Sequence, residues 1–250
     1  YLNNVDLNAR RFNCFNNVAV LNGGGLYATA GSEIVIRRLL FTGNAANLGG
    51  ALFFNDSCRV VVNDGNIMNN SADNGGGIFA SAVTATIGAV SLQNNTAGNL
   101  GGALHLSSNS DLGSNDMVVN NNSANRGGGI SILNSIADFV GGEINNNYAI
   151  RGGGIYSLGS DLEFFNGTLT QNNSESFGGG LLSYSTNLVM DSTDVTFNTS
   201  DSSSGGGIMC FNYDSTLTCD VVITNSLISR NDDYKSINSG GDCFLYNVMQ

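Results

Sequence analysis

Hydrophobic positions recur along this chain with a nearly constant period. Eight aliphatic residues each follow a run of glycines, or of glycine and alanine, and successive ones lie 25 to 27 residues apart. These anchor residues are Leu26, Leu52, Ile78, Leu104, Ile130, Ile155, Leu181 and Ile208. A repeat this regular over most of a chain is typical of a solenoid, in which each repeat packs only against its neighbours.

Each repeat contains short apolar clusters separated by turn residues. In residues 52–78 the clusters lie at 52–54, 60–62 and 66–68, and Asn, Asp, Ser and Gly stand between them. Short runs of strand-forming residues bounded by turn residues predict strands, and no segment keeps a helical period. We therefore predict an all-β, single-stranded parallel β-helix of about nine turns, with three short strands and about 26 residues per turn.

Alignment of the repeats gives two further apolar columns and one polar column. The apolar columns are Phe41, Ile67, Leu92, Val119, Ile144, Leu169 and Val195, and Ile34, Val60, Leu112, Leu162 and Leu188. The polar column is Asn17, Asn44, Asn70, Asn95, Asn122, Asn147, Asn172, Asn198 and Asn231. We expect one continuous apolar core and an asparagine ladder along it. The glycines predict a corner with positive φ, or one so tight that a Cβ would strike the next turn.

The repeats make residues 1–250 a single β-helix. We expect residues 1–22 to form an incomplete first turn. The stretch 209–250 breaks the period, and we expect it to be an irregular, longer terminal turn that caps the solenoid. The chain begins with Tyr1 and has no recognisable signal peptide, so we expect an internal or mature segment of a longer protein.

Two short motifs resemble a known family. The sequence GGAL occurs at 49–52 and 101–104, and Phe41 and Asn44 form an F-x-x-N motif. These resemble the repeats of the chlamydial polymorphic membrane proteins, which combine GGA plus an aliphatic residue with F-x-x-N. The other six copies carry Gly in place of Ala, and the resemblance covers roughly residues 12–231. It implies a right-handed β-helix displayed outside the cell, like an autotransporter passenger, with an adhesive role.

The composition limits the classes of partner that we expect. The formal net charge is −11 and the pI is about 4.1, and an acidic surface repels phosphate backbones and anionic membranes. No apolar run approaches the roughly 18 residues of a membrane-spanning helix. We therefore expect neither nucleic acid as a partner nor direct membrane insertion. The glycine runs lack the lysine and helix of a phosphate loop, and we predict no cofactor.

Acidic residues are the candidates for chemistry. Asp138 and Glu163 each lie eight residues after an anchor, and Asp194 and Asp220 lie thirteen and twelve after theirs, so each pair is expected to stack. Neither pair has a basic residue in register. Solvated surface, a calcium pair and catalysis are the three interpretations; we favour the first and predict no catalytic residue and no metal site.

An aromatic stripe is the strongest candidate for binding. The residues directly after the anchors include Tyr27, Phe53, Phe79, His105 and Tyr156, and Phe244 ends the series. Strand alternation turns them outward if the anchors point inward, so we predict an exposed stripe that contacts glycans or a second rod. The alternative is a self-stacking column, or one that a flanking segment covers.

Cysteines and glycosylation sequons add two smaller predictions. Cys210 and Cys219 are nine residues apart and could close a disulfide in an oxidising compartment. Sequons for N-glycosylation stand at Asn55, Asn69, Asn94, Asn121, Asn166, Asn172 and Asn198.

Together these patterns favour a non-catalytic, extracellular or cell-surface scaffold or adhesin. Its expected partners are other chains of a surface assembly, or host or glycan ligands, and a homo-oligomer is compatible with the pattern. One alternative is the structural subunit of a surface filament that packs laterally or end to end. Another is a carbohydrate-active β-helix enzyme.

Overall fold

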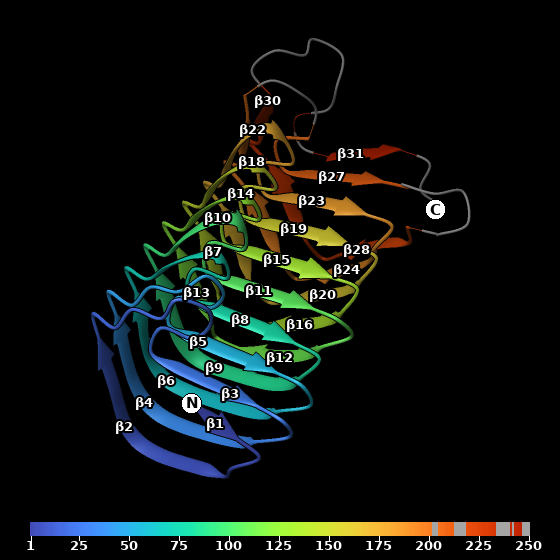
Figure 1. The fold of residues 1–250 in the computed structure, drawn as a ribbon. Coiled ribbons are helices and arrows are strands. Elements are labelled where there is room, and N and C mark those ends of the chain that lie inside the picture. The colour runs from blue at the N-terminus through green and yellow to red at the C-terminus, as the bar shows by residue number, and fades with distance from the viewer. Residues whose placement is uncertain (202–204, 213–218, 234–240, 242, 247–250) are drawn as a thin grey trace.

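The chain forms a right-handed parallel β-solenoid, seen from the side in Figure 1, which shows the strands passing left to right in front and returning behind as the chain rises. The computed structural model describes residues 1–201, 205–212, 219–233, 241 and 243–246, the last four through their backbone. Within these residues the chain contains strands and no helix, and all strands pair in parallel. The predicted all-β parallel β-helix is confirmed. Eight anchor residues mark about eight coils, one fewer than predicted.

Sheet A holds the strands that begin at the anchors. Its neighbours in the sheet are successive coils of the chain. Its strands are β1 (Leu2–Asn3), β3 (Leu26–Thr29), β5 (Leu52–Asn55), β8 (Ile78–Ser81), β11 (Leu104–Ser107), β15 (Ile130–Leu133), β19 (Ile155–Leu158), β23 (Leu181–Tyr184), β27 (Ile208–Phe211) and β31 (Cys243–Tyr246).

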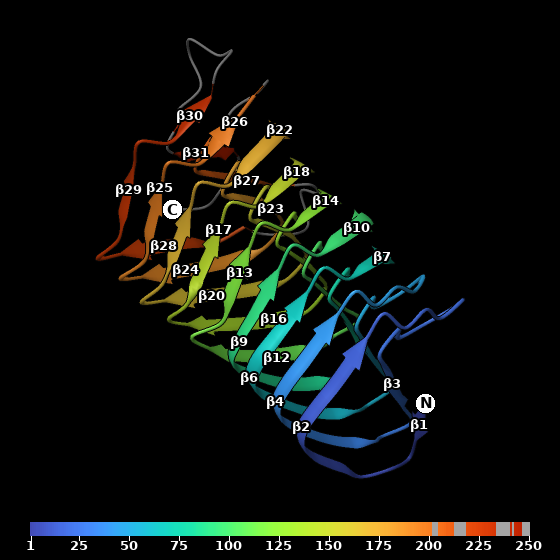
Figure 2. The ribbon, with the colours of Figure 1, turned by 90° about the vertical axis from the view of Figure 1, so that its left-hand side faces the viewer.

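Sheet B is bent and takes up the longest part of each coil. In the first coils one strand runs through the bend: β2 (Leu7–Phe15), β4 (Glu33–Thr42), β6 (Arg59–Met68) and β9 (Thr84–Gln93). In later coils the bend separates two strands: β12 (Asp111–Asn115) and β13 (Val118–Asn120), β16 (Ile136–Val140) and β17 (Glu143–Asn145), β20 (Asp161–Phe165) and β21 (Thr168–Thr170), β24 (Asn187–Asp191) and β25 (Asp194–Thr196), and β28 (Val221–Thr224) and β29 (Leu227–Ser229). Figure 2 shows these strands stacked from β2 to β29.

Sheet C lies between the asparagines and the glycines of each coil. Its strands are β7 (Ser71–Asn74), β10 (Thr96–Leu100), β14 (Ser123–Arg126), β18 (Tyr148–Arg151), β22 (Asn173–Phe177), β26 (Thr199–Ser200) and β30 (Asp232–Asp233). The repeat pattern predicts no strand here, because these residues are mostly polar. The predicted clusters 60–62 and 66–68 instead share the one bent strand β6. From β5 to β30 each coil therefore contributes to three sheets, with different boundaries from those expected, whereas the two coils before β5 reach sheet C only through isolated bridges.

The inward side chains of the three sheets form one core. Leu52 lies opposite Leu26 and Ile78 in the neighbouring coils, as the anchor column requires. All members of the three predicted apolar columns are buried and belong to a single hydrophobic cluster. Stacking therefore buries apolar surface that no single coil could bury alone.

The asparagine column lies at the corner between sheets B and C. From Asn17 to Asn231, each side-chain Nδ2 donates to the Oδ1 of the next asparagine at 2.9–3.0 Å. The backbone N–H of each asparagine from Asn17 to Asn198 also donates to that oxygen, as from Asn95 to Asn122 at 2.8 Å. These side chains therefore satisfy buried backbone groups as well as one another.

The glycines form the corner between sheets C and A for two separate reasons. The first glycine of each run has a positive φ, as in Gly49 at 64° and Gly75 at 62°. A Cβ on the second, Gly50 or Gly76, would lie closer than van der Waals contact allows to a glycine carbonyl oxygen of the next coil. Both predicted explanations hold, each at its own position.

The first and last coils are less regular. Residues 1–22 contribute β1 and β2 but no strand to sheet C. In the stretch 209–250, β28, β29 and β30 continue sheets B and C. Residues 213–218, 234–240, 242 and 247–250 lie outside the described part of the chain, and the capping role stays a prediction. Among the residues that the structure describes, no helix has the length and hydropathy needed to cross a membrane.

Candidate functional site

The predicted stripe forms a continuous outward column on sheet A. We use "outward column" for Tyr27, Phe53, Phe79, His105, Ser131, Tyr156, Leu182 and Met209, which are register partners from strand to strand. The Phe53 and Phe79 rings stack with their centroids 5.1 Å apart, and Tyr27 meets Phe53 edge-on at 4.7 Å. The residues that follow, such as Phe54, point into the core, so the column faces away from it.

The outward column is not exposed, which corrects the sequence prediction. Phe53 is 3% exposed, His105 4% and Tyr156 8%, and only Tyr27 and Phe79 are half-buried. Close stacking along the column removes much of each ring from solvent. Phe244 was also predicted to belong here, but its side chain lies outside the described part of the structure. The column fits the alternative interpretation of a self-stacking column, and its role in binding stays a prediction.

The C-terminal part of the outward column belongs to a second apolar cluster. Tyr156, Leu182 and Met209 form it together with Phe177 and Phe211 and their neighbours. Phe177 ends β22 in sheet C and packs edge-on against Phe211 in sheet A, with ring centroids 6.4 Å apart. The end of a sheet C strand therefore lies over the outer face of sheet A. The repeat pattern does not predict this contact, because the register partner of Phe177 in the preceding coil is Arg151 rather than another aromatic residue.

His105 is the titratable member of the column. Its ring centroid lies 5.1 Å from that of Phe79, and its Nδ1 has no hydrogen-bond partner among the described residues. Burial lowers the pKa of His105 to about 4. The side chain is therefore neutral at physiological pH and suits packing better than proton transfer.

A hydroxyl column inside the corner between sheets A and B was missed. Ser135 Oγ donates to the Leu133 carbonyl at 2.9 Å and accepts from the Ser110 backbone N–H at 3.2 Å. Ser160 repeats both contacts one coil on. The sequence did contain a signal, because Ser32, Ser110, Ser135, Ser160 and Thr186 all stand five or six residues after an anchor.

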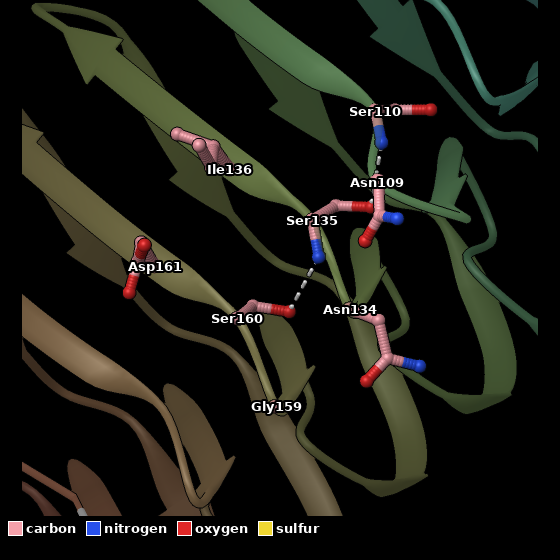
Figure 3. A pocket seen from close by; sticks show the side chains of 8 residues that line it. All are labelled: Asn109, Ser110, Asn134, Ser135, Ile136, Gly159, Ser160 and Asp161. Atoms are coloured by element: carbon pink, nitrogen blue, oxygen red, sulfur yellow. Dashed lines mark hydrogen bonds between the residues drawn. The ribbon is translucent and has the colours of Figure 1, made fainter.

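Two hollows follow the outside of this same corner. The first, of about 270 Å³, is lined by Asn109, Ser110, Asn134, Ser135, Ile136, Gly159, Ser160 and Asp161. Figure 3 shows their side chains together with the hydrogen bonds between successive serines. The second, of about 440 Å³, is lined by Ser57, Arg59, Ala82, Val83, Thr84, Ser108 and Asn109. Because both include Asn109, they form one surface strip over several coils.

The side chains of this strip can make hydrogen bonds and apolar contacts. The serine hydroxyls of the first hollow are already bonded to backbone groups. Asn109, Asn134 and Asp161 remain to face a ligand, and Asp161 accepts a hydrogen bond from Asn187 at 2.7 Å. Ile136 is 45% exposed and adds an apolar surface. Amides, a carboxylate and an aliphatic group suit a sugar ring with its hydroxyls.

The predicted acid pairs have different outcomes. Asp138 and Glu163 are register partners on the outer face of sheet B, as expected. Burial, followed by the nearby charges of Asp111 and Asp161, raises the pKa of Asp138. The expected stacking of Asp194 with Asp220 is wrong, because Asp194 pairs with Leu227. Within the described residues, no group of three His, Cys, Asp or Glu side chains is arranged to hold a metal ion.

The thiols of Cys210 and Cys219 lie together without a disulfide between them. Both are buried, and Cys219 Sγ also lies 3.1 Å from the Thr186 carbonyl oxygen. A hydrogen bond from Cys210 lowers the pKa of Cys219 to about 7. The structure brings the predicted pair together, and their oxidation to a disulfide stays a prediction.

The sequons divide into two groups. Asn69, Asn94, Asn121 and Asn166 are exposed, and Asn55 is half-buried. Asn172 and Asn198 are fully buried, and their side-chain nitrogens donate within the asparagine column. The structure therefore corrects the prediction at these two positions, because a folded chain cannot present them to a glycosyltransferase.

Comparison of the chain with known proteins does not assign it to a family. No family model, curated protein or solved structure matches it.

Proposed function

We propose that this chain is a non-catalytic solenoid of the cell surface or the secreted space that acts as an adhesin or scaffold and contacts glycan ligands. The observation that supports this most directly is the strip of two hollows sharing Asn109. A surface that follows one corner over several coils suits an extended polymer better than a small molecule. The resemblance to polymorphic membrane protein repeats points the same way.

The rod also has the rigidity that a display function needs. The asparagine column would act as the predicted ladder, since it links each coil to the next through side-chain and backbone hydrogen bonds. A scaffold held together in this way keeps its surface groups at fixed positions along the axis.

Bead attachment tests the proposal. Beads coated with the chain should attach to glycan-bearing cells, and removal of the cell-surface glycans should release them. The variant carrying Asn134→Gly and Asp161→Asn should reduce attachment several-fold. Each substitution copies the residue at the same position one coil on, Gly159 and Asn187, so the fold is expected to persist. Attachment unchanged by glycan removal would refute the proposal.

The matched control also copies neighbouring coils. Asn66→Ser and Asp194→Thr introduce the residues found at Ser91 and Thr168 and leave the strip untouched. This variant should attach like the original chain. A filament subunit, the first alternative, would instead give polymers that grow with concentration in light scattering.

One observation favours an enzyme as a second candidate. Asp138 and Glu163 lie one strand spacing apart, about 4.8 Å between backbones, and the two carboxyl groups of retaining glycosidases lie about 5–5.5 Å apart. The raised pKa of Asp138 suits a general acid. Release of reducing ends from a polysaccharide, lost in both Asp138→Asn and Glu163→Gln, would replace the adhesin proposal by this one.

A further inference from the structure

Cationic side chains are scarce in this chain, and two pairs of them are arranged unfavourably. The chain has 9 Lys and Arg against 20 Asp and Glu. Yet Arg10 lies directly opposite Arg37, and Arg126 directly opposite Arg151, on adjacent strands. Like charges in such cross-strand positions destabilise a sheet. Such a pair lowers the stability of the sheet, and neither arginine faces one of the chain's many carboxylates. A site for an external anion explains this arrangement better than a contribution to stability does.

The pair on sheet C is the one without internal compensation. Arg126 ends β14 and Arg151 ends β18, and both are exposed. Their register neighbours are Leu100 on one side and Phe177 on the other, so no carboxylate adjoins them in the column. Among the described residues, neither guanidinium has an ion-pair or hydrogen-bond partner.

The other pair is already partly engaged. Arg37 donates to Asn8 Oδ1 at 3.3 Å. The hollow beside this pair also contains Arg38, which forms an ion pair with Asp64 at 3.7 Å. A carboxylate of the chain thus already contributes negative charge there.

The surroundings of Arg126 and Arg151 match an acidic sugar. Together with Asn99, Asn125 and Ile150 they line a hollow of about 230 Å³. Guanidinium groups bind carboxylates and sulfates through paired hydrogen bonds. The two amides can bond sugar hydroxyls, and Ile150, 38% exposed, offers an apolar contact for the ring's C–H face.

We propose that Arg126 and Arg151 bind the carboxylate or sulfate group of an acidic glycan, with Asn99, Asn125 and Ile150 contacting the sugar that bears it. This inference rests on the proposed adhesin function and specifies the charge of its ligand. A nucleic acid would need a longer basic footprint and stacking side chains, and the net charge of −11 opposes it. The site lies on sheet C, apart from the strip at the corner between sheets A and B.

Calorimetric titration of the whole 250-residue chain tests this proposal. The probes are an oligogalacturonate for carboxylates, a heparin-derived oligosaccharide for sulfates, a neutral dextran oligosaccharide of the same length, and a single-stranded oligonucleotide. The test variant carries Arg126→Gln and Arg151→Gln. The control carries Arg11→Gln and Arg230→Gln, which removes the same charge from two exposed residues that line neither the strip nor this hollow, and Arg230 lies against the Phe197 ring rather than opposite another arginine.

The expected result is binding of an acidic oligosaccharide that weakens with added salt, and weaker or no binding of dextran. The test variant should lose about ten-fold or more in affinity, as the loss of charge-assisted hydrogen bonds predicts, and the control less than about two-fold. Circular dichroism and thermal unfolding should match for all three proteins. A variant with Arg126→Lys and Arg151→Lys should lie between the two, because lysine keeps the charge but not the paired geometry.

Three results would overturn the proposal. The first is that neither acidic oligosaccharide binds, the second is an equal loss in both double variants, and the third is tighter binding of the oligonucleotide at this site. Bead attachment separates these failures from a failure of the proposed function. If bead attachment still depends on glycans and on Asn134 and Asp161, but acidic oligosaccharides do not bind, this inference is refuted and the proposed function is not.

Discussion

Two sets of buried polar side chains in this molecule differ in how they are satisfied. At the corner between sheets B and C, Asn122 Oδ1 accepts from the backbone and side chain of Asn95, and Asn122 Nδ2 donates to Asn147 and to the Leu92 carbonyl. In the outward column of sheet A, His105 Nδ1 and Ser131 Oγ are equally buried but lack a partner among the described residues.

The difference shows that burial and hydrogen-bond demand are separate properties in a solenoid. A corner exposes backbone N–H and carbonyl groups that the strands no longer pair, so the side chain there is chosen by those groups. The outward column lies on paired strands whose backbone is already satisfied. Its members are chosen by the shape of their neighbours, and polar atoms there are tolerated rather than required.

The largest expected effect comes from breaking the corner. Asn122→Ala should lower the free energy of unfolding by about 3–5 kcal/mol, because it leaves several buried donors and acceptors unpaired at a net cost of about 1–3 kcal/mol each. Urea unfolding followed by circular dichroism measures this. The adjacent, exposed Asn121→Gly is the control, since φ at Asn121 is 55° and glycine accepts it. Equal losses in the two variants would remove the distinction between corner and surface.

A pH titration of stability examines the outward column. The pKa of His105 is about 4 in the folded chain and about 6.5 in the unfolded chain, so the unfolded chain binds more protons between these values. Stability contributed by the neutral ring is complete above pH about 6.5 and is lost as the pH falls toward about 4. The loss should reach up to about 3 kcal/mol.

His105→Phe is the matched control for that titration. A phenyl ring continues the stack from Phe79 and carries no titratable group. Its stability should therefore lack the His105 component between pH about 6.5 and 4, which the difference between the two unfolding curves isolates. If the stability of the two proteins changes with pH in the same way, burial does not lower the pKa of His105.

The hydroxyl column should give an intermediate effect. Ser135→Ala removes a donor to Leu133 and an acceptor for the Ser110 backbone N–H. We expect a loss of about 1–2 kcal/mol in the free energy of unfolding, since fewer groups are left unpaired than at Asn122. Chemical denaturation of both variants under one condition makes the comparison. A cost as large as that at Asn122 would contradict this ranking.

The smallest effect is expected at Ser131. Its Oγ has no partner among the described residues, so Ser131→Ala should change the free energy of unfolding by less than about 0.5 kcal/mol, in either direction. The same denaturation experiment measures it. A loss approaching that of Ser135→Ala would mean that Ser131 has a partner in solution and that the two sets of side chains are alike.

The sequence predicted those features that repeat with identical chemistry. The anchors stay Leu or Ile and the column asparagines stay Asn, so both columns, and the burial of the anchors, followed from spacing alone. The burial of the asparagines did not follow, since Asn172 and Asn198 also fit glycosylation sequons. The hydroxyl column was missed because Cys58 and Val83 interrupt it. Sheet C was missed because its strands are short and polar and pair through backbone groups that leave no periodic side-chain pattern.

The candidate sites were harder to predict, because they depend on how one sheet lies against another. Strand alternation correctly turned Phe53 and Tyr156 outward, but it cannot report that rings at the strand spacing shield one another or that Phe177 reaches over from sheet C. The facing of Arg126 and Arg151 was likewise invisible without knowing that β14 and β18 are paired strands.

The second glycine of each run has a consequence for how such a chain can change over generations. The backbone of the following coil occupies the space that even a methyl group at Gly50 or Gly76 would need. Substitution of these glycines by a larger residue is therefore opposed by the neighbouring backbone. Duplication of an entire coil, in contrast, recreates the same close approach at the new junction. Rods of this kind can therefore lengthen or shorten by whole coils, and each such event moves the surface groups above it by one fixed step.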